Sequence, residues 1–248
     1  MGALALSILL VFVISFLLGS IPWGIVISKY LYKTDIRKHG SGNIGTTNAL
    51  RTLGKAGGGL VFLLDFGKGV FSGVIALLAY LWFVAAEPGS IGAFELKAFM
   101  VLSSGNIVGN PDITHEVQSL LATATCGCML GHIFSPWLKF KGGKGVAVAV
   151  GCVFVSLGWL PAVSELALFA LLVILTRYVS VGSLIAVAVL PLVSLFIYWG
   201  NAYAAIMITV AALAVIWAHR GNIKRLRAGT ELKLGDKRAK KRQGQLGA

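Results

Sequence analysis

Long apolar runs alternate with short polar segments along almost the whole chain. A transmembrane helix needs about 20 consecutive apolar residues to cross a hydrocarbon core about 30 Å thick, and most of the runs approach this length. The pattern predicts an all-α polytopic membrane protein with seven transmembrane helices. These helices are expected at residues 3–26, 60–84, 119–137, 145–160, 161–176, 182–199 and 202–218.

The basic residues predict the orientation of these helices. With seven crossings, 20 of the 22 Lys and Arg residues fall in the connections on one side of the membrane or in the C-terminal segment on that side. Loops rich in Lys and Arg stay on the cytoplasmic side of a membrane. We therefore expect the amino terminus outside and the carboxyl terminus in the cytoplasm.

Residues 1–233 are expected to form a single membrane domain, because no repeat or linker divides them. Residues 85–118 contain four of the nine acidic residues and a Gly/Asn/Pro-rich stretch, and they are expected to make an extracytoplasmic excursion. Residues 234–248 are strongly basic, which predicts a disordered cytoplasmic tail attracted to anionic lipid headgroups. Membrane lipids are therefore expected partners.

Composition excludes several classes of protein. With 57% hydrophobic and 12% charged residues, the chain is not a water-soluble globule. The cysteines lie within apolar runs and no His, Cys and acid spacing fits a metal, so we expect neither a disulfide framework nor a metal site. Among the few ionisable residues within the runs, Asp65 and Lys68 are expected to pair at i,i+3 spacing. Glu165 is expected to be an interfacial acid without a catalytic part.

The loop after the first apolar run is rich in small polar residues, with the sequence GSGNIGTTNALR at positions 40–51. Its glycines permit close backbone approach, its hydroxyl and amide groups offer hydrogen bonds, and its arginine offers a planar fork suited to phosphate. We interpret it as an anion-binding loop; the alternative is a solvated turn between two helices. The candidate ligands are Ser41, Asn43, Thr47, Asn48 and Arg51.

A second glycine-rich loop, FKGGKG, precedes the fourth predicted helix. Glycines before a helix can expose backbone N–H groups where the helix dipole favours an anion, and two lysines add positive charge. Because no Gly-Lys pair is followed by Ser or Thr, this is not a nucleotide-binding Walker A loop. The alternative is a glycine hinge with lysines that only obey the positive-inside rule. The candidate ligands are Lys141, Gly142, Gly143 and Lys144.

Two further polar clusters end helices on the same side. Ser180 follows the fifth predicted helix, and His219 and Asn222 end the seventh on one helical face. The imidazole can serve as a general base toward an alcohol or donate a hydrogen bond to phosphate, and the sequence leaves both open. His132, before the glycine loop, is expected to be a structural hydrogen-bonding residue.

Five segments of the chain closely resemble the bacterial acyl-phosphate:glycerol-3-phosphate acyltransferase family, PlsY. In order, they are GSGNIGTTNALR, FLLDFGKG, GHIFSPWLKFKGGKGVA, RYVS and HRGNIKRLRAGTE. The resemblance implies a seven-helix bacterial inner-membrane enzyme with its active site at the cytoplasmic face. It implies transfer of a fatty acyl group from acyl phosphate to the sn-1 hydroxyl of glycerol 3-phosphate, giving lysophosphatidic acid and inorganic phosphate. This reaction is the first step of phospholipid synthesis.

The resemblance also implies roles for individual residues and partners. It assigns the phosphorylated substrates to Ser41, Arg51, Lys144, Ser180, His219 and Asn222, and Asn43, Thr47, Asn48, Lys141, Gly142 and Gly143 match the same motifs. We expect His219, Lys144 and Ser41 to be catalytic. A functional link to the enzyme that makes acyl phosphate is implied, and neither a cofactor nor nucleic acid is expected.

Several alternatives remain open from the sequence. The proton acceptor is either His219 or a phosphate oxygen of a substrate. An organic-phosphate transporter would need polar groups spread through the bilayer, and an acyl-CoA-dependent acyltransferase would use another donor. No histidine is followed by aspartate at the fifth position, so the HxxxxD base of other glycerolipid acyltransferases is absent. Residues 87–118 and the tail after Leu234 depart from the family pattern by being longer.

Overall fold

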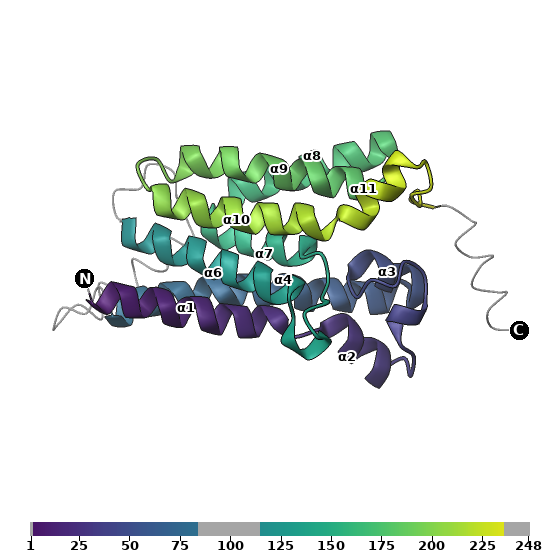
Figure 1. Cartoon of the computed structure of the whole chain (residues 1–248), viewed down its shortest axis with the longest axis horizontal. Helices are drawn as coiled ribbons and strands as arrows, with labels where there is room; N and C mark the ends of the chain where they lie inside the picture. Colours follow the sequence, from purple (N-terminus) through teal and green to yellow (C-terminus); the bar gives the residue numbers. More distant parts are fainter. Residues whose placement is uncertain (1, 84–114, 236–248) are drawn as a thin grey trace, which may run out of the picture.

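The computed structural model of the chain describes residues 2–83 and 115–235, and most of these residues are helical, with no strand in either range. The longer helices run side by side along the long axis of the molecule (Figure 1). They are α1 (Gly2–Ser20), α4 (Gly54–Phe83), α6 (His115–Ile133), α7 (Val146–Ser156), α8 (Trp159–Thr176), α9 (Val179–Ile197) and α10 (Ala202–Ala218). Three shorter helices are α2 (Trp23–Tyr30), α3 (Thr46–Thr52) and α11 (Arg220–Arg227).

Each predicted apolar run overlaps one of the longer helices, which confirms a multi-pass, all-α membrane architecture. Five described helices are long and apolar enough to cross a membrane, and α10 with α11, bent by 50°, would make six. Helix α7 has 11 residues and a length of about 16 Å, shorter than a hydrocarbon core of about 30 Å. Seven crossings and the predicted orientation of the termini stay predictions.

Several predicted boundaries are wrong. The first predicted helix, 3–26, is interrupted between Ser20, where α1 ends, and Trp23, where α2 begins, and α4 begins at Gly54, not at residue 60. Helix α6 begins at His115, not at residue 119, because its first turn is hydrogen-bonded inside the bundle: Asn201 Nδ2 donates to the His115 carbonyl at 2.9 Å and to Gln118 Oε1 at 3.2 Å. Helix α7 ends at Ser156, ahead of Gly158, whose φ of 96° is incompatible with a right-handed helix. Leu157 and Gly158 make the short turn from α7 to α8.

The predicted outer excursion and basic tail fall mainly outside the described residues. Of residues 85–118, only the last four are described, and they belong to α6. The predicted tail begins at Leu234, and only Leu234 and Gly235 of it are described. The Leu234 N–H donates to the Arg177 carbonyl at 2.7 Å, and Arg177 Nη2 donates to the Leu234 carbonyl at 3.1 Å.

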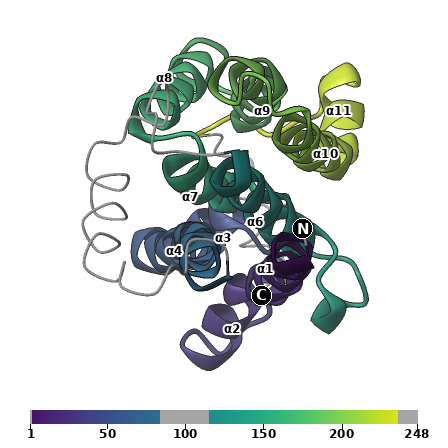
Figure 2. The same cartoon turned by 90° about the vertical axis from the view of Figure 1, so that its left-hand side faces the viewer.

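Helix α6 forms the centre of the bundle and contacts α1, α4, α7 and α10. Figure 2 shows α8, α9 and α10 along one side and α1 and α4 on the other, with α6 and α7 between them. The closest pairing, of α1 with α6, depends on small residues, as is typical of membrane helices. A Cβ at Gly131 would overlap the carbonyl oxygen of Phe16.

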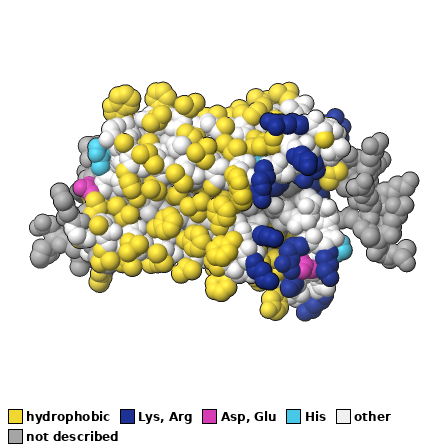
Figure 3. All heavy atoms as spheres, viewed as in Figure 1, with side chains coloured by type: hydrophobic (Ala, Val, Ile, Leu, Met, Phe, Trp, Pro, Cys, Tyr) yellow, Lys and Arg dark blue, Asp and Glu magenta, His cyan; other side chains and the backbone are white. Residues whose placement is uncertain are grey.

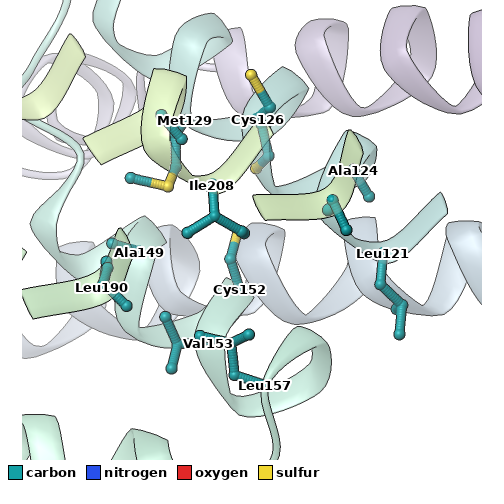
Figure 4. Packing of buried hydrophobic residues seen from close by; sticks show 14 of the residues in the cluster. Leu121, Ala124, Cys126, Met129, Ala149, Cys152, Val153, Leu157, Leu190 and Ile208 are labelled. Carbon is teal, nitrogen blue, oxygen red and sulfur yellow. The ribbon is translucent and has the colours of Figure 1, made fainter. Parts of the chain in front are cut away.

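The main core lies where α6, α7, α9 and α10 meet (Figure 4). Leu121 and Met129 of α6 pack near Val153 of α7, Leu190 of α9 and Ile208 of α10, and all five are buried. All three cysteines are buried as free thiols, two on α6 and one on α7. This core fixes α7 against α9 and α10, and these helices carry much of the site.

The outer surface divides into an apolar belt and a basic end. Figure 3 shows hydrophobic side chains over most of the bundle and Lys and Arg side chains gathered at the end where α2, α3 and α11 lie. Helix α8 is the most exposed of the long apolar helices, because only 6% of its residues are buried inside the protein. The one-sided distribution of positive charge expected from the sequence is therefore visible in the fold.

Candidate functional site

Four segments that are distant in sequence meet at the basic end of the bundle, around a cavity of about 500 Å³. They are the loop before α3, the turn before α7, the start of α9 and the junction of α10 with α11. Nine of the predicted site residues line the cavity: Ser41, Asn43, Thr47, Asn48, Arg51, Lys144, Ser180, His219 and Asn222. Lys141, Gly142 and Gly143 do not line it, and Lys141 is exposed.

Asn48 holds the first loop together. Its Nδ2 donates to the carbonyls of Ile36, His39 and Asn43 at 2.8–3.1 Å, and its Oδ1 accepts the Ser41 N–H at 2.9 Å. The amide is only 2% exposed, so both of its polar atoms are already engaged by the loop backbone. Asn48 therefore shapes the loop, and its contact with substrate stays a prediction.

The remaining polar groups of this loop border the cavity. Asn43 Oδ1 accepts the Gly45 N–H at 2.9 Å immediately before α3, which leaves the amide nitrogen of its side chain for other partners. The hydroxyl of Thr46 is buried and has no hydrogen-bond partner among the described residues, although it lines the cavity. Thr46 lies within the motif but was missed as a candidate, because a threonine at the start of a helix usually serves as a cap.

The glycines before α7 pack against α6 and do not present their amides to a ligand. The Gly142 N–H donates to the Ile133 carbonyl at 2.9 Å, and the Gly143 N–H donates to the His132 carbonyl at 3.0 Å. A Cβ at Gly143 would overlap His132 Nε2. The expectation that both amides bind an anion is wrong, because these two N–H groups already bind the last carbonyls of α6.

The turn nevertheless presents Lys144 and the first residues of α7 to the cavity. Burial lowers the pKa of Lys144 to about 8; the attraction of Glu231 opposes this shift, and repulsion from Arg225 and Arg51 adds to it. Lys144 is therefore an ammonium at pH 7, grouped with two guanidinium groups and one carboxylate. This excess of positive charge favours an anionic ligand.

His219 lies at the junction of α10 and α11 and is 1% exposed. Its Nδ1 is 2.8 Å from the Val215 carbonyl, which can only accept, so the proton is on Nδ1 and Nε2 carries the lone pair. Burial lowers the pKa of His219 to about 4, while the hydrogen bond to Val215 opposes the shift and Lys144 adds to it. At pH 7 the free protein therefore presents Nε2 as an acceptor.

Glu231 and Arg225 were missed as site residues, and both line the cavity. Glu231 accepts hydrogen bonds from Asn222 Nδ2 at 2.6 Å and Arg225 Nε at 2.7 Å. Burial alone would raise the pKa of Glu231, but the combined effect of hydrogen bonds, including these two, and of the positive charge of Arg225 lowers it. Both residues belong to the HRGNIKRLRAGTE segment, which could have identified them as candidates. A carboxylate such as Glu231 is, however, unexpected beside an anion-binding site.

The cavity extends from this polar end into an apolar arm between α7, α8 and α9. The lining of the arm is mainly aliphatic and includes Val150, Val153, Leu166, Phe169, Val187 and Leu190. Glu165, near the start of α8, also borders the cavity. One cavity thus combines a cationic end with an apolar arm.

Known proteins with similar sequences and structures share one description. The family model for glycerol-3-phosphate acyltransferase matches residues 9–229. Glycerol-3-phosphate acyltransferases of Rhodopseudomonas palustris and Acaryochloris marina are each 36% identical to the chain, over 91% and 92% of it and 94% and 92% of their own lengths.

Solved structures of PlsY, an integral membrane glycerol 3-phosphate acyltransferase, resemble the fold. The glycerol 3-phosphate form has a TM-score of 0.70 and 33% identity, covering 92% of this chain and 96% of that one. The lysophosphatidic acid form has a TM-score of 0.67 and 32% identity over the same shares.

Proposed function

The chain belongs to the glycerol-3-phosphate acyltransferase family, and we propose that it transfers a fatty acyl group from acyl phosphate to the sn-1 hydroxyl of glycerol 3-phosphate. The products are lysophosphatidic acid and inorganic phosphate. One observation carries the proposal: a single cavity joins a cationic end, with Arg51, Lys144 and Arg225, to an apolar arm. Such a cavity fits substrates that combine phosphate groups with a fatty chain.

Each part of the cavity has a role in this reaction. The apolar arm holds the acyl chain, so that the carbonyl carbon and the anhydride phosphate lie at the polar end. Arg51 and Lys144, with the hydroxyl groups of Ser41, Thr47 and Ser180, hold the phosphates. Holding both reactants together supplies much of the rate, because well-oriented reactants can lower the barrier by about 7–11 kcal/mol.

The chemistry needs one proton acceptor and no covalent acyl-enzyme. The sn-1 oxygen of glycerol 3-phosphate attacks the carbonyl carbon, and the bond from that carbon to the phosphate oxygen breaks. His219 Nε2 accepts the hydroxyl proton, and the leaving phosphate departs with both electrons of the broken bond. Two bound phosphates near His219 favour its protonated form, which makes the imidazole a stronger base in the complex than in the free protein. Lys144 stabilises the negative charge that develops on the phosphate.

The charge distribution supports a location for the enzyme. The site lies at the basic end of the bundle, and the positive-inside rule favours a site at the cytoplasmic face of a bacterial inner membrane. Substrates made in the cytoplasm could reach it there, including acyl phosphate from the enzyme that produces this donor. A transporter for organic phosphates is disfavoured, because the apolar arm is lined mainly by aliphatic side chains, which do not solvate a phosphate.

Phosphate release tests the proposal directly. Detergent-purified protein is given glycerol 3-phosphate with palmitoyl phosphate or, in a parallel reaction, palmitoyl-CoA. We expect phosphate release and lysophosphatidic acid with the acyl phosphate only, and a loss of at least about 100-fold in Lys144→Ala. Lys55→Ala, which removes an exposed lysine outside the cavity, is the matched control. Equal rates of lysophosphatidic acid formation with palmitoyl-CoA would contradict the proposed donor. Full activity in Lys144→Ala would contradict the proposed site.

A further inference from the structure

A buried polar cluster lies beneath the turn before α7 and has no part in the mechanism above. Lys68 of α4 places its Nζ 3.0 Å from Asp65 Oδ1, 2.9 Å from His132 Nδ1 and 3.0 Å from the Ile21 carbonyl oxygen. All three side chains are nearly inaccessible to solvent, with exposures of 2–4%. The ion pair expected from the i,i+3 spacing of Asp65 and Lys68 is confirmed.

The cluster fixes the tautomer of His132. An ammonium has three N–H donors and no acceptor, and here three acceptors surround it: a carboxylate, a backbone carbonyl and the ring nitrogen Nδ1. His132 Nδ1 must therefore offer its lone pair to Lys68. Protonation of Nδ1 would place its N–H group opposite the N–H groups of Lys68, with no acceptor between them. The ring is therefore neutral and carries its proton on Nε2.

The Nε2–H group faces the turn that carries Lys144. His132 and Asp65 border the same cavity as Lys144, and the ring lies so close to Gly143 that a Cβ there would overlap Nε2. The backbone of the same residue also holds the turn, because the Gly143 N–H donates to the His132 carbonyl at 3.0 Å. Nε2 itself has no hydrogen-bond partner in residues 2–83 and 115–235.

We propose that His132 is a further phosphate-binding residue, which donates its Nε2–H to a phosphate oxygen held beside Lys144. Lys68 and Asp65 are positioning residues, because they act only by fixing the ring and its tautomer. The proposal rests on the proposed function for the identity of the anion. It explains why a lysine, and not a neutral donor, contacts Nδ1: an amide or hydroxyl could reverse its direction, whereas an ammonium cannot.

The tautomer can be measured without turnover. Nitrogen NMR of detergent-solubilised protein with ¹⁵N-labelled histidine distinguishes a protonated from an unprotonated ring nitrogen, and His132→Gln assigns the His132 signals. We expect Nε2–H alone, and a shift of this group when inorganic phosphate is added. His115, at the opposite end of α6, is the internal control and should not shift. An Nδ1–H tautomer, or saturation with phosphate without a change at His132, would overturn the proposal.

Kinetics separate binding from a structural role. His132→Gln can place its amide N–H near the position of Nε2, whereas His132→Leu has no donor of similar shape. We expect His132→Leu to raise the KM for a phosphorylated substrate about 10- to 100-fold, because hydrogen bonds to charged groups are strong, and His132→Gln to restore most of this loss. Equal KM values and equal losses of thermal stability in the two variants would show that His132 contributes packing and no hydrogen bond to phosphate.

The pair beneath His132 is tested by a double substitution. Removing one charge of a buried pair leaves the other uncompensated, so Asp65→Asn and Lys68→Gln are combined. Glutamine at position 68 can both donate and accept, so we expect both His132 tautomers in the NMR spectrum and a KM between those of wild type and His132→Leu. A single Nε2–H tautomer in a folded double variant would contradict the positioning role. Failure of the acyl transfer assay alone would leave the phosphate-dependent NMR shift intact and would count against the proposed reaction only.

Discussion

Two buried histidines border the cavity, and their partners give them opposite chemistry. The backbone carbonyl of Val215 accepts a hydrogen bond from His219 Nδ1 and leaves Nε2 as an acceptor. The ammonium of Lys68 donates to His132 Nδ1 and leaves Nε2 as a donor. One ring is therefore suited to receive a proton from an alcohol, and the other to bind a phosphate oxygen.

Residue type alone therefore does not predict the role of a histidine in this site. The nitrogen that faces away from the ligand determines what the facing nitrogen can do. The two histidines are also fixed differently. Next to His219, the side chains of Asn222 and Arg225 hydrogen-bond to Glu231 and hold the helix junction. At His132, the backbone holds the next turn, because the Gly143 N–H donates to the His132 carbonyl.

The largest expected effect comes from His219→Ala. Removing the proton acceptor should lower kcat about 10²- to 10⁴-fold and change the KM for glycerol 3-phosphate much less, because general base catalysis acts in the transition state. Initial rates of phosphate release against glycerol 3-phosphate concentration measure both constants. His219→Gln retains a polar side chain that cannot take a proton. A wild-type kcat in His219→Gln would mean that a phosphate oxygen accepts the proton. The two histidines would then not differ in their ability to act as a base.

Gly143→Ala should damage the His132 side of the cavity selectively. A Cβ at this position overlaps Nε2 and must push the turn away, and a displacement of about 1 Å near a reacting group can cost about 100-fold. We expect this loss in kcat/KM with little change in the thermal unfolding of the bundle. Gly67→Ala is the matched control, because a Cβ there meets nothing within 4 Å in the middle of α4. Full activity in Gly143→Ala would show that the turn tolerates movement.

The sequence predicted which segments meet, but not how the side chains within them are used. Apolar runs long enough to cross a membrane become helices because no other structure satisfies their backbone, and polar motifs at one set of helix ends then lie close together. The direction of Asn48 into its own loop depends on the carbonyls of Ile36 and His39, and the use of the Gly143 amide depends on α6. These contacts are tertiary, so motif spacing cannot reveal them.

Activity should depend on pH through two groups on different sides of the site. His219, with a pKa of about 4, must be neutral to accept a proton, so kcat/KM should fall as pH decreases through this value. Lys144, with a pKa of about 8, must be charged to bind phosphate, so kcat/KM should fall as pH increases through 8. Each limb should approach a tenfold loss per pH unit after correction for substrate ionisation.

Variants assign the two limbs of this profile. Lys144→Arg should remove the alkaline limb, because a guanidinium stays protonated. His132→Gln should leave the acidic limb in place, since on the present assignment His132 does not exchange a proton, whereas His219→Gln should remove it. An acidic limb that disappears with His132→Gln would exchange the roles of the two histidines.

The smallest expected effect concerns the support of His219 by Glu231. Glu231→Gln removes the charge that pairs with Arg225 and binds Asn222, but keeps one acceptor, so we expect a loss of about 1 kcal/mol and a decrease in Tm of about 2–4 °C. In the wild type this contribution should also be lost as pH falls through the lowered pKa of Glu231. Asp35→Asn, which removes a surface partner of Arg37 also at 2.7 Å, is the matched control and should change Tm less. Equal shifts in the two variants would mean that the junction carrying His219 gains no more from its carboxylate than an exposed loop does.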